Sequence, residues 1–352
     1  MTIENYMSNS VENMPSGFER DISLPPFPEF DDAYLPSNVA LHFYFAPHRT
    51  VEQFDEGKPL LQRADVFIPE AAGWNEQTQK DFNSISKGGD EKRYRKLVEA
   101  QQIHLNSGYA REQYEGLKGT YKPVVLIDAH RDRADLNVGD FTKRYRKGIT
   151  SDVEDTLHGV ASALASIAEM AYARDLIMGD NLGPKVTELV TNHPRLSNKE
   201  QVNVLLVLGF SHTELYQAMV DSGVFEGRIE ETTWSGITEI DIETAVISTY
   251  KRGEVPTRDD MAEFLISWAL TCTSLAVRPD KKLFNFDALY TRERDITTYI
   301  GQRVVDSMMQ MGEEGLSIAH RLLRSVPTQE DAQLIADIAN QAQELVAASF
   351  QE

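Results

Sequence analysis

Two histidines and a glutamate stand close to the ends of apolar stretches of the sequence. His48 and His212 each follow such a stretch by three residues, and Glu70 comes directly after another. A buried strand rarely ends in a carboxylate that has no partner, because removing the charge from water is costly. Two imidazoles and a carboxylate are ligands suited to zinc, manganese, cobalt or iron, with coordination positions left open for water or a substrate. The three residues therefore indicate a candidate metal site.

The residues around His212 predict a turn from a strand into a helix. Ser211 and Glu214 have the spacing of a capping box, which places His212 at the first position of the helix. The same spacing recurs just after His48. The positive end of a helix dipole disfavours an imidazolium, so a neutral ring that binds metal or accepts a proton is expected. The alternative is that His212 only packs or caps within a tight turn.

Two further charged residues are candidates for the same site. Asp128 belongs to a cluster of polar residues, IDAHRDRADLN (127–137), that follows another apolar stretch. It is expected either to orient a histidine of the site or to form part of a salt-bridged loop. Arg174 stands beside Asp175 on a long predicted helix, where the alternative is a pairing with surface carboxylates.

The elements that would position these residues follow one another as strand and helix. Four short runs rich in valine, isoleucine and phenylalanine predict buried strands at 39–45, 64–69, 123–129 and 203–209. Longer stretches with helical periodicity lie between them, and the clearest, at 153–182, repeats apolar residues along one face. This alternation predicts an α/β fold with a largely parallel central sheet flanked by helices. In such a sheet both histidines would open onto the edge at which ligands bind.

Three regions are expected along the chain. Residues 1–36 are polar and proline-rich and predict an N-terminal arm. Residues 37–240 predict the α/β core that carries the site. Residues 241–352 are helical in pattern, and no glycine-rich or serine-rich linker precedes them, so we expect a helical extension packed on the core. A separable helical subdomain is the alternative.

Charge and cysteine content restrict the classes of partner. The 55 acidic and 35 basic side chains give a formal charge of −20, which would repel phosphate backbones and anionic lipid headgroups. We therefore expect neither a nucleic acid nor a membrane as partner. The single cysteine, Cys272, excludes an intramolecular disulfide and is typical of a reducing compartment, so a cytoplasmic location is expected. The sequence also lacks a serine nucleophile motif and a phosphate-binding loop motif.

The order of these motifs resembles the Tiki/TraB superfamily, which includes ChaN-like haem-uptake and erythromycin-esterase-like proteins. Its members have a G-x-x-H motif after a strand, a second strand ending in glutamate, an arginine-containing helix, and a second G-x-x-H motif. The corresponding segments here are FAPH (45–48), RADVFIPE (63–70), ARDLIMGDNL (173–182) and LGFSHTELYQAMVDSG (208–223). The resemblance covers residues 40 to 235 in outline and leaves out the helical C-terminal region.

The resemblance implies a site made of His48, Glu70 and His212, with Arg174 as the binder of an anion or a carbonyl. A metal held by the first three would polarise a carbonyl and lower the pKa of a bound water. Glu70 would act as a ligand or as a general base. Phe45 departs from the family, which usually has glycine there. The departure implies an altered pocket or a member without catalysis.

Two functions from different classes follow from the resemblance. The first is a metal-dependent hydrolase that acts on a peptide or ester bond of a small-molecule or peptide substrate. The second is a protein that binds a ligand such as haem or a peptide in the same cleft without turnover. A third possibility from the pattern alone is that the C-terminal helices mediate homo-oligomerisation.

Overall fold

The protein divides into two compact units. The computed structural model describes Leu24, Phe27 and residues 35–46, 51–89, 113, 115–136, 141–223, 225–234, 242–276, 294–324 and 328–349. The sheet unit comprises Leu24–Phe141 and Ile167–Lys251, and the helical unit comprises Thr142–Ser166 and Arg252–Glu352. Most of the predicted arm at 1–36 lies outside the described residues. The predicted change at about residue 240 differs from these units, because helix α8 (Ile242–Lys251) still belongs to the sheet unit.

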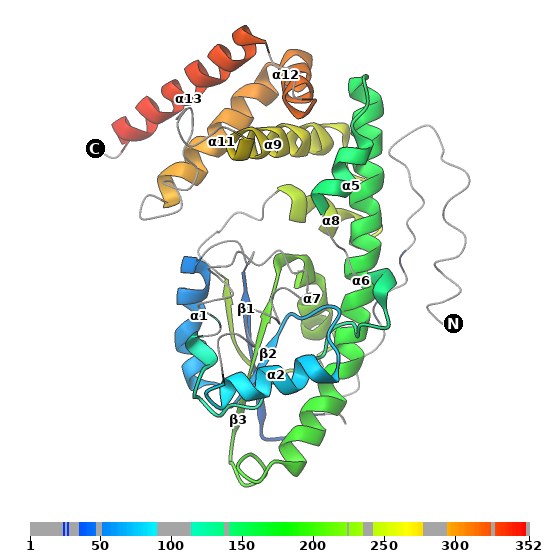
Figure 1. Cartoon of the computed structure of the whole chain (residues 1–352), viewed down its shortest axis with the longest axis vertical. Coiled ribbons are helices and arrows are strands. Elements are labelled where there is room, and N and C mark those ends of the chain that lie inside the picture. The colour runs from blue at the N-terminus through cyan, green and yellow to red at the C-terminus, as the bar shows by residue number, and fades with distance from the viewer. Residues whose placement is uncertain are drawn as a thin grey trace. The chain divides into compact units, whose positions relative to one another are not determined.

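The predicted α/β fold with a parallel sheet is confirmed (Figure 1). The four strands, in the spatial order β2-β3-β1-β4, are β1 (Val39–Phe45), β2 (Val66–Pro69), β3 (Val202–Leu208) and β4 (Ile229–Trp234). All neighbouring strands are parallel, so their carboxyl ends share one edge of the sheet. Strand β4 was not predicted, because its sequence IEETTW is polar. It lies at the end of the strand order, where β1 is its neighbour among the described strands.

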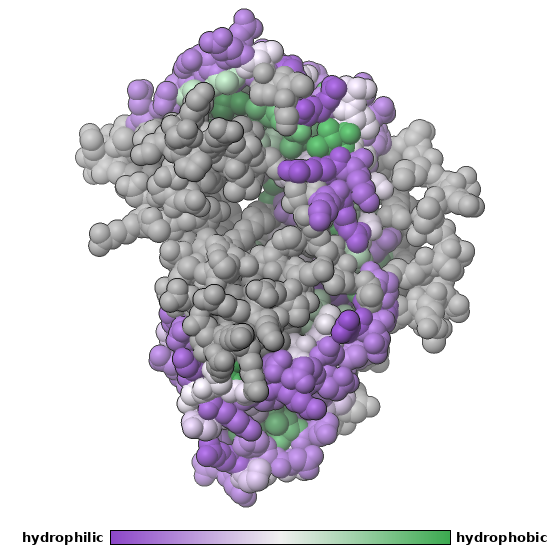
Figure 2. All heavy atoms as spheres, in the orientation of Figure 1, coloured by the Kyte–Doolittle hydropathy of each residue, from purple (hydrophilic) through white to green (hydrophobic). Residues whose placement is uncertain are grey.

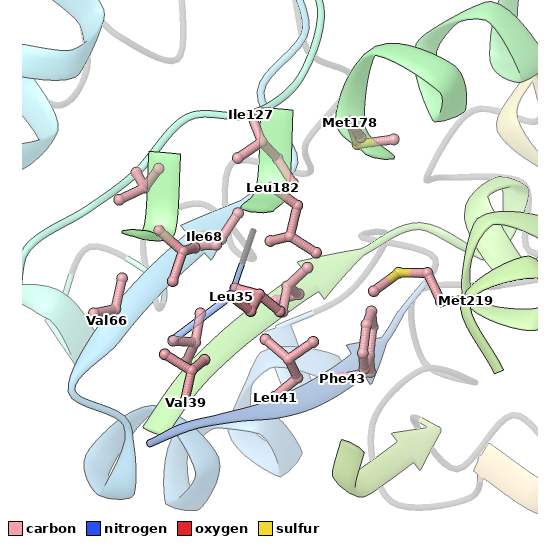
Figure 3. Close-up of a cluster of buried hydrophobic side chains, with 14 of the residues drawn as sticks. Leu35, Val39, Leu41, Phe43, Val66, Ile68, Ile127, Met178, Leu182 and Met219 are labelled. Carbon is pink, nitrogen blue, oxygen red and sulfur yellow. The ribbon is translucent and has the colours of Figure 1, made fainter. Parts of the chain in front are cut away.

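Helices cover both faces of the sheet. These helices are α1 (Val51–Arg63) and α2 (Glu76–Ser86) on one face and α6 (Val153–Asn192) and α7 (Thr213–Asp221) on the other. Successive side chains of a strand point to opposite faces, so Leu41 and Phe43 of β1 lie on the face packed against α6 and α7. Figure 3 shows this cluster, in which Met178 and Leu182 of α6 approach the strands. The cluster fixes the position of α6, which carries Arg174.

The stretch 123–129 does not form the strand that its sequence predicts. It lies beside β2, but a single bridge, between Val124 and Phe67, has strand geometry within this described stretch. The N–H of Val125 donates to the carbonyl of Phe67 at 2.9 Å. The next bond of a parallel ladder would need an N–H from Pro69, and proline has none. The ladder therefore stops after one bridge.

Side chains replace the missing ladder bonds of this stretch. Gln79 of α2 donates to the carbonyl of Val124 at 2.5 Å and accepts from the N–H of Leu126 at 3.1 Å. Asn83 accepts from the N–H of Val124 at 3.0 Å, and Lys185 of α6 donates to the carbonyl of Leu126 at 2.7 Å. The backbone groups that face away from β2 thus have partners from two helices, as buried polar groups require.

The helical unit has a core of its own. Its helices include α5 (Phe141–Gly148), the first part of α6, α9 (Arg258–Ala276), α11 (Arg294–Gln310), α12 (Glu313–Leu323) and α13 (Gln329–Ser349). Ile266, Met308 and Ile318 lie in a buried cluster formed by α9, α11, α12 and α13. These helices confirm the helical pattern predicted beyond residue 240. In Figure 2 most of the coloured surface is hydrophilic, with a green apolar area in the helical unit.

None of the helices in the described ranges combines the length and the apolar character that a membrane crossing requires.

The side-chain bonds to the 123–129 stretch yield a stability prediction. Replacing Gln79 with leucine leaves the carbonyl of Val124 and the N–H of Leu126 without their partner, at about 1–3 kcal/mol for each buried group. We expect Gln79→Leu to lower the free energy of unfolding by about 2–4 kcal/mol in urea denaturation followed by circular dichroism. The control is Gln77→Leu on the same helix, because Gln77 is exposed and bonds only Asp81. Equal effects of the two variants would contradict this account.

Candidate functional site

Glu70 and His212 meet at the carboxyl ends of β2 and β3. The backbone N–H of Glu70 continues the pairing of the two strands by donating to the carbonyl of Val207 at 2.9 Å. Its carboxylate lies with Oε1 3.2 Å from Nε2 of His212, and Oε2 accepts from the N–H of Gly209 at 2.7 Å. A Cβ at residue 209 would meet Oε2 at 2.9 Å, so the glycine of the second G-x-x-H motif permits this close approach. The strand ends therefore place the two side chains in direct contact.

Arg174 joins Glu70 to Asp128. Its Nε donates to Oδ1 of Asp128 at 3.0 Å and its Nη2 to Oδ2 at 2.6 Å, a two-point contact that fixes the plane of the guanidinium. Nη2 also donates to Oε1 of Glu70 at 2.7 Å. Arg174 is buried and pairs with the buried Asp128, so the predicted alternative of a pairing with surface carboxylates is wrong for Arg174.

Asp128 is also held by its own loop and by the loop after β2. The backbone N–H groups of Ala71 and Ala129 donate to its carboxylate at 3.2 and 2.7 Å. The indole N–H of Trp74 donates to the backbone carbonyl of Asp128 at 2.6 Å. Lys185 lies over the face of that indole at 4.1 Å from the ring centroid. These contacts keep Asp128 in the position where it meets Arg174.

His212 is oriented by Asp175, the residue after Arg174. Consecutive residues of an α-helix point about 100° apart, so α6 directs Arg174 toward Glu70 and Asp175 toward His212. Oδ1 of Asp175 contacts Nδ1 of His212, and both side chains are completely buried. The expectation that Asp128 might orient a histidine is therefore wrong, because Asp128 holds the arginine and Asp175 holds the histidine.

The charge of His212 differs from the prediction. Burial lowers the pKa of His212, but the carboxylates of Glu70 and Asp175 outweigh burial and raise it to about 9. Both ring nitrogens face carboxylate oxygens, and only an imidazolium can donate to both. The two carboxylates thus favour the charged ring, whereas the helix dipole alone would favour the predicted neutral ring.

The turn that carries His212 also differs from the predicted capping box. Residues Phe210–His212 form a 3-10 turn, and His212 is the N-cap residue of α7 rather than its first residue. Glu214 does not cap the helix. Its Oε2 accepts from Nζ of Lys251, at the end of α8, at 2.8 Å, and Nζ also donates to the carbonyl of Ser211 at 2.5 Å and contacts Oδ2 of Asp175. The turn is thus fixed by a lysine from another helix.

Most of the predicted site residues come together. Glu70, Asp128, Arg174 and His212 form one connected group, although the segments that carry them are far apart in the sequence. His48 and the neighbouring residues of the range 47–50 lie outside the described residues. Phe45 is fully buried and packs edge-to-face on Tyr216 of α7, so its side chain belongs to the apolar core of the sheet.

Asp175 and Lys251 are the members of the group that sequence reasoning missed. Asp175 could have been found, because an Arg-Asp pair in the middle of a largely apolar helix must bury at least one charge. The sequence does not mark Lys251 as a buried residue. Lys251 and Arg252 are adjacent basic residues, and nothing local indicates that the first is buried and the second exposed. Only the three-dimensional position of α8 distinguishes the two residues.

The donor set fits the predicted divalent metal in part. An Asp-His pair that leaves Nε2 facing a carboxylate is a common arrangement behind a metal ligand. Here, however, the raised pKa of His212 favours a protonated ring, and Oε1 of Glu70 already accepts from Arg174. Within the described residues, no three side chains of the His, Cys, Asp or Glu type are arranged so that together they could hold a metal ion. A metal would have to displace that proton and draw on His48, so the metal stays a prediction.

Glu70 is the least buried side chain of the group, and the buried Arg174 keeps 7 % of its side chain exposed. The Glu70 side chain is 18 % exposed, whereas His212 is completely buried. Among the described residues, Nη1 of Arg174 has no hydrogen-bond partner, because its contacts use Nε and Nη2. A carboxylate that can take a proton and a fixed N–H donor therefore stand side by side. This pairing can activate water and stabilise a developing oxyanion.

The raised pKa of His212 predicts how stability changes with pH. Its pKa rises from 6.5 in the unfolded chain to about 9 in the folded protein. The charged ring therefore stabilises the fold fully below pH 6.5, and this contribution, on the order of 3 kcal/mol, is lost as the pH rises through 9. We expect the difference in unfolding free energy between wild type and His212→Asn to shrink between pH 6.5 and 10. A difference that stays constant over this range would contradict the charged state.

Comparisons with known proteins give no information about the function, so a proposal must rest on the fold and the site geometry. No family model, no curated protein and no solved structure matches the chain. The resemblance to the Tiki/TraB superfamily accordingly rests on the order of its short motifs and stays a prediction. What the structure adds is the direct contact between Glu70, Arg174 and His212, three residues that the resemblance singles out.

Proposed function

We propose that the sheet unit is a hydrolase that cleaves an ester or peptide bond at the carboxyl ends of β2 and β3. The observation that carries the proposal is the state of Glu70. Its Oε1 is held by two buried cations, Arg174 and His212, while the side chain keeps part of its surface exposed. A carboxylate placed in this way is preorganised and can still reach a substrate.

Glu70 is the general base of the proposed reaction. Its Oε2 accepts a hydrogen bond from the N–H of Gly209 and takes a proton from water as the water oxygen attacks the carbonyl carbon. The negative charge that forms on the carbonyl oxygen is stabilised by Nη1 of Arg174. The bond to the leaving oxygen or nitrogen then breaks, and Glu70 returns the proton to it. Water is thereby divided between the two products.

Asp128, Asp175 and His212 support this chemistry without contacting the substrate. Asp128 keeps the guanidinium in one plane, so that Nη1 points in one direction. Asp175 orients His212, and His212 contacts Oε1 of Glu70. The resemblance to the Tiki/TraB superfamily supports these assignments, because it independently selects Glu70, Arg174 and His212. The metal expected from that resemblance would be held by His48, Glu70 and His212 and would polarise the carbonyl.

The decisive experiment compares two glutamate variants on a panel of ester and peptide substrates. We expect Glu70→Gln to lower kcat/KM by about 10²–10⁴-fold, the usual contribution of a general base. Glu231→Gln is the matched control, since Glu231 pairs with exposed Arg63 away from the site. Equal activity of wild type and Glu70→Gln on every cleaved substrate would contradict the role of Glu70.

Elemental analysis of the dialysed wild-type protein tests the metal separately. Stoichiometric metal that is lost in folded His48→Ala and His212→Ala variants would place it in the same site. Activity that persists in metal-free protein would mean that Glu70 and Arg174 suffice. No turnover of any substrate, together with a Soret band on haem addition that His212→Ala removes, would favour the ligand-binding alternative.

A further inference from the structure

We infer that Lys251 is a positioning residue for His212, an inference that rests on the proposed function for its effect on catalysis. Lys251 is the last residue of α8 and is 5 % exposed. It does not contact Glu70 or Arg174, and the proposed reaction does not use it. Its three partners are instead the carboxylate of Asp175, the carbonyl of Ser211 and the carboxylate of Glu214. Ser211 and Glu214 stand on either side of His212 in the sequence, and Asp175 contacts the ring of His212.

The first part of the argument concerns Asp175. Its Oδ1 contacts the histidine ring and its Oδ2 contacts Lys251, so the two oxygens are held by different cations. Fixing both oxygens fixes the plane of the carboxylate, and the plane of the carboxylate sets the direction of the imidazole. Without Lys251, Oδ2 would lose its partner in a fully buried position. The carboxylate could then rotate, and His212 would lose its fixed orientation.

The second part concerns the turn that carries His212. Lys251 donates to the residue before His212, Ser211, and to the residue two positions after it, Glu214. One ammonium group with three N–H donors therefore connects the turn that carries His212 to the carboxylate of Asp175, which orients the ring. An arginine or a neutral side chain could not place three donors at a single point in this way.

A purely structural role for Lys251 would neutralise Asp175 without affecting the position of His212. The two roles differ in what they change. Loss of charge compensation alone lowers stability, whereas loss of positioning also changes the hydrogen bond between Nδ1 of His212 and Asp175 in the folded protein. A misplaced His212 lets Glu70 move, which lowers kcat more than it raises KM, because substrate binding does not involve His212.

The experiment follows the Nδ1 proton of His212 by NMR without substrate. A proton held between imidazole and carboxylate gives a resonance far downfield, and Asp175→Asn identifies it by removing it. We expect Lys251→Met to abolish or shift this resonance in folded protein and to lower kcat at least 10-fold with KM changed less than threefold. The control is Lys199→Met, because Lys199 forms an exposed ion pair with Asp65 at 2.6 Å, and it should change neither quantity.

Each outcome decides the inference. An unchanged resonance in folded Lys251→Met overturns it, even if wild type proves to be a hydrolase. A lost resonance supports the positioning role even if no substrate is cleaved. The absence of cleavage by wild type would count against the proposed function alone. If Lys251→Met does not fold, Lys251→Gln, which keeps two N–H donors without the charge, is read by the same resonance. A Lys251 ammonium in wild type whose protons exchange with water as fast as those of Lys199 would also overturn the inference.

Discussion

Burying Asp128 and Asp175 is possible only because each carboxylate has a cation within hydrogen-bond distance. A lone ionised carboxylate in an apolar interior is strongly unfavourable, and removing one partner of a buried pair typically costs about 3–5 kcal/mol. Arg174 compensates Asp128, and Lys251 together with His212 compensates Asp175. Helix α6, helix α8 and the turn before α7 must therefore be placed accurately enough for these hydrogen bonds to form. The charged group therefore restricts the relative placement of these elements, as the packing of the apolar core also does.

The sheet determines where the charged group lies, and α6 supplies two of its charged residues. Parallel strands end at one edge, which places Glu70 next to Gly209 without any contribution from charge. Helix α6 then supplies two adjacent residues of opposite charge, each directed to a different partner. Because apolar residues such as Met178 and Leu182 anchor the same helix on the sheet, packing and charge are satisfied by one placement of α6.

Much of this arrangement follows from local patterns in the sequence. Short apolar runs predict β1 and β3, and residues at strand ends predict Glu70 and His212 as members of one site. The failures have physical reasons. The stretch 123–129 has the composition of a strand, but Pro69 on its neighbour cannot continue the ladder. The charge of His212 depends on Asp175 and Glu70, which are distant in sequence, whereas local reasoning considered only the helix dipole. Lys251 belongs to a helix whose position depends on the whole fold.

The side-chain bonds around the stretch 123–127 also protect the edge of the sheet. An extended segment beside β2 would normally present free N–H and C=O groups to solvent, and a second chain could add a strand there. Gln79 and Asn83 occupy these groups at Val124, and Asn181 occupies the carbonyl of Ile127. An incoming strand would first have to break these bonds and would gain no additional hydrogen bonds in return. These hydrogen bonds therefore oppose edge-to-edge aggregation at this side of the sheet, although the sheet does not close into a barrel.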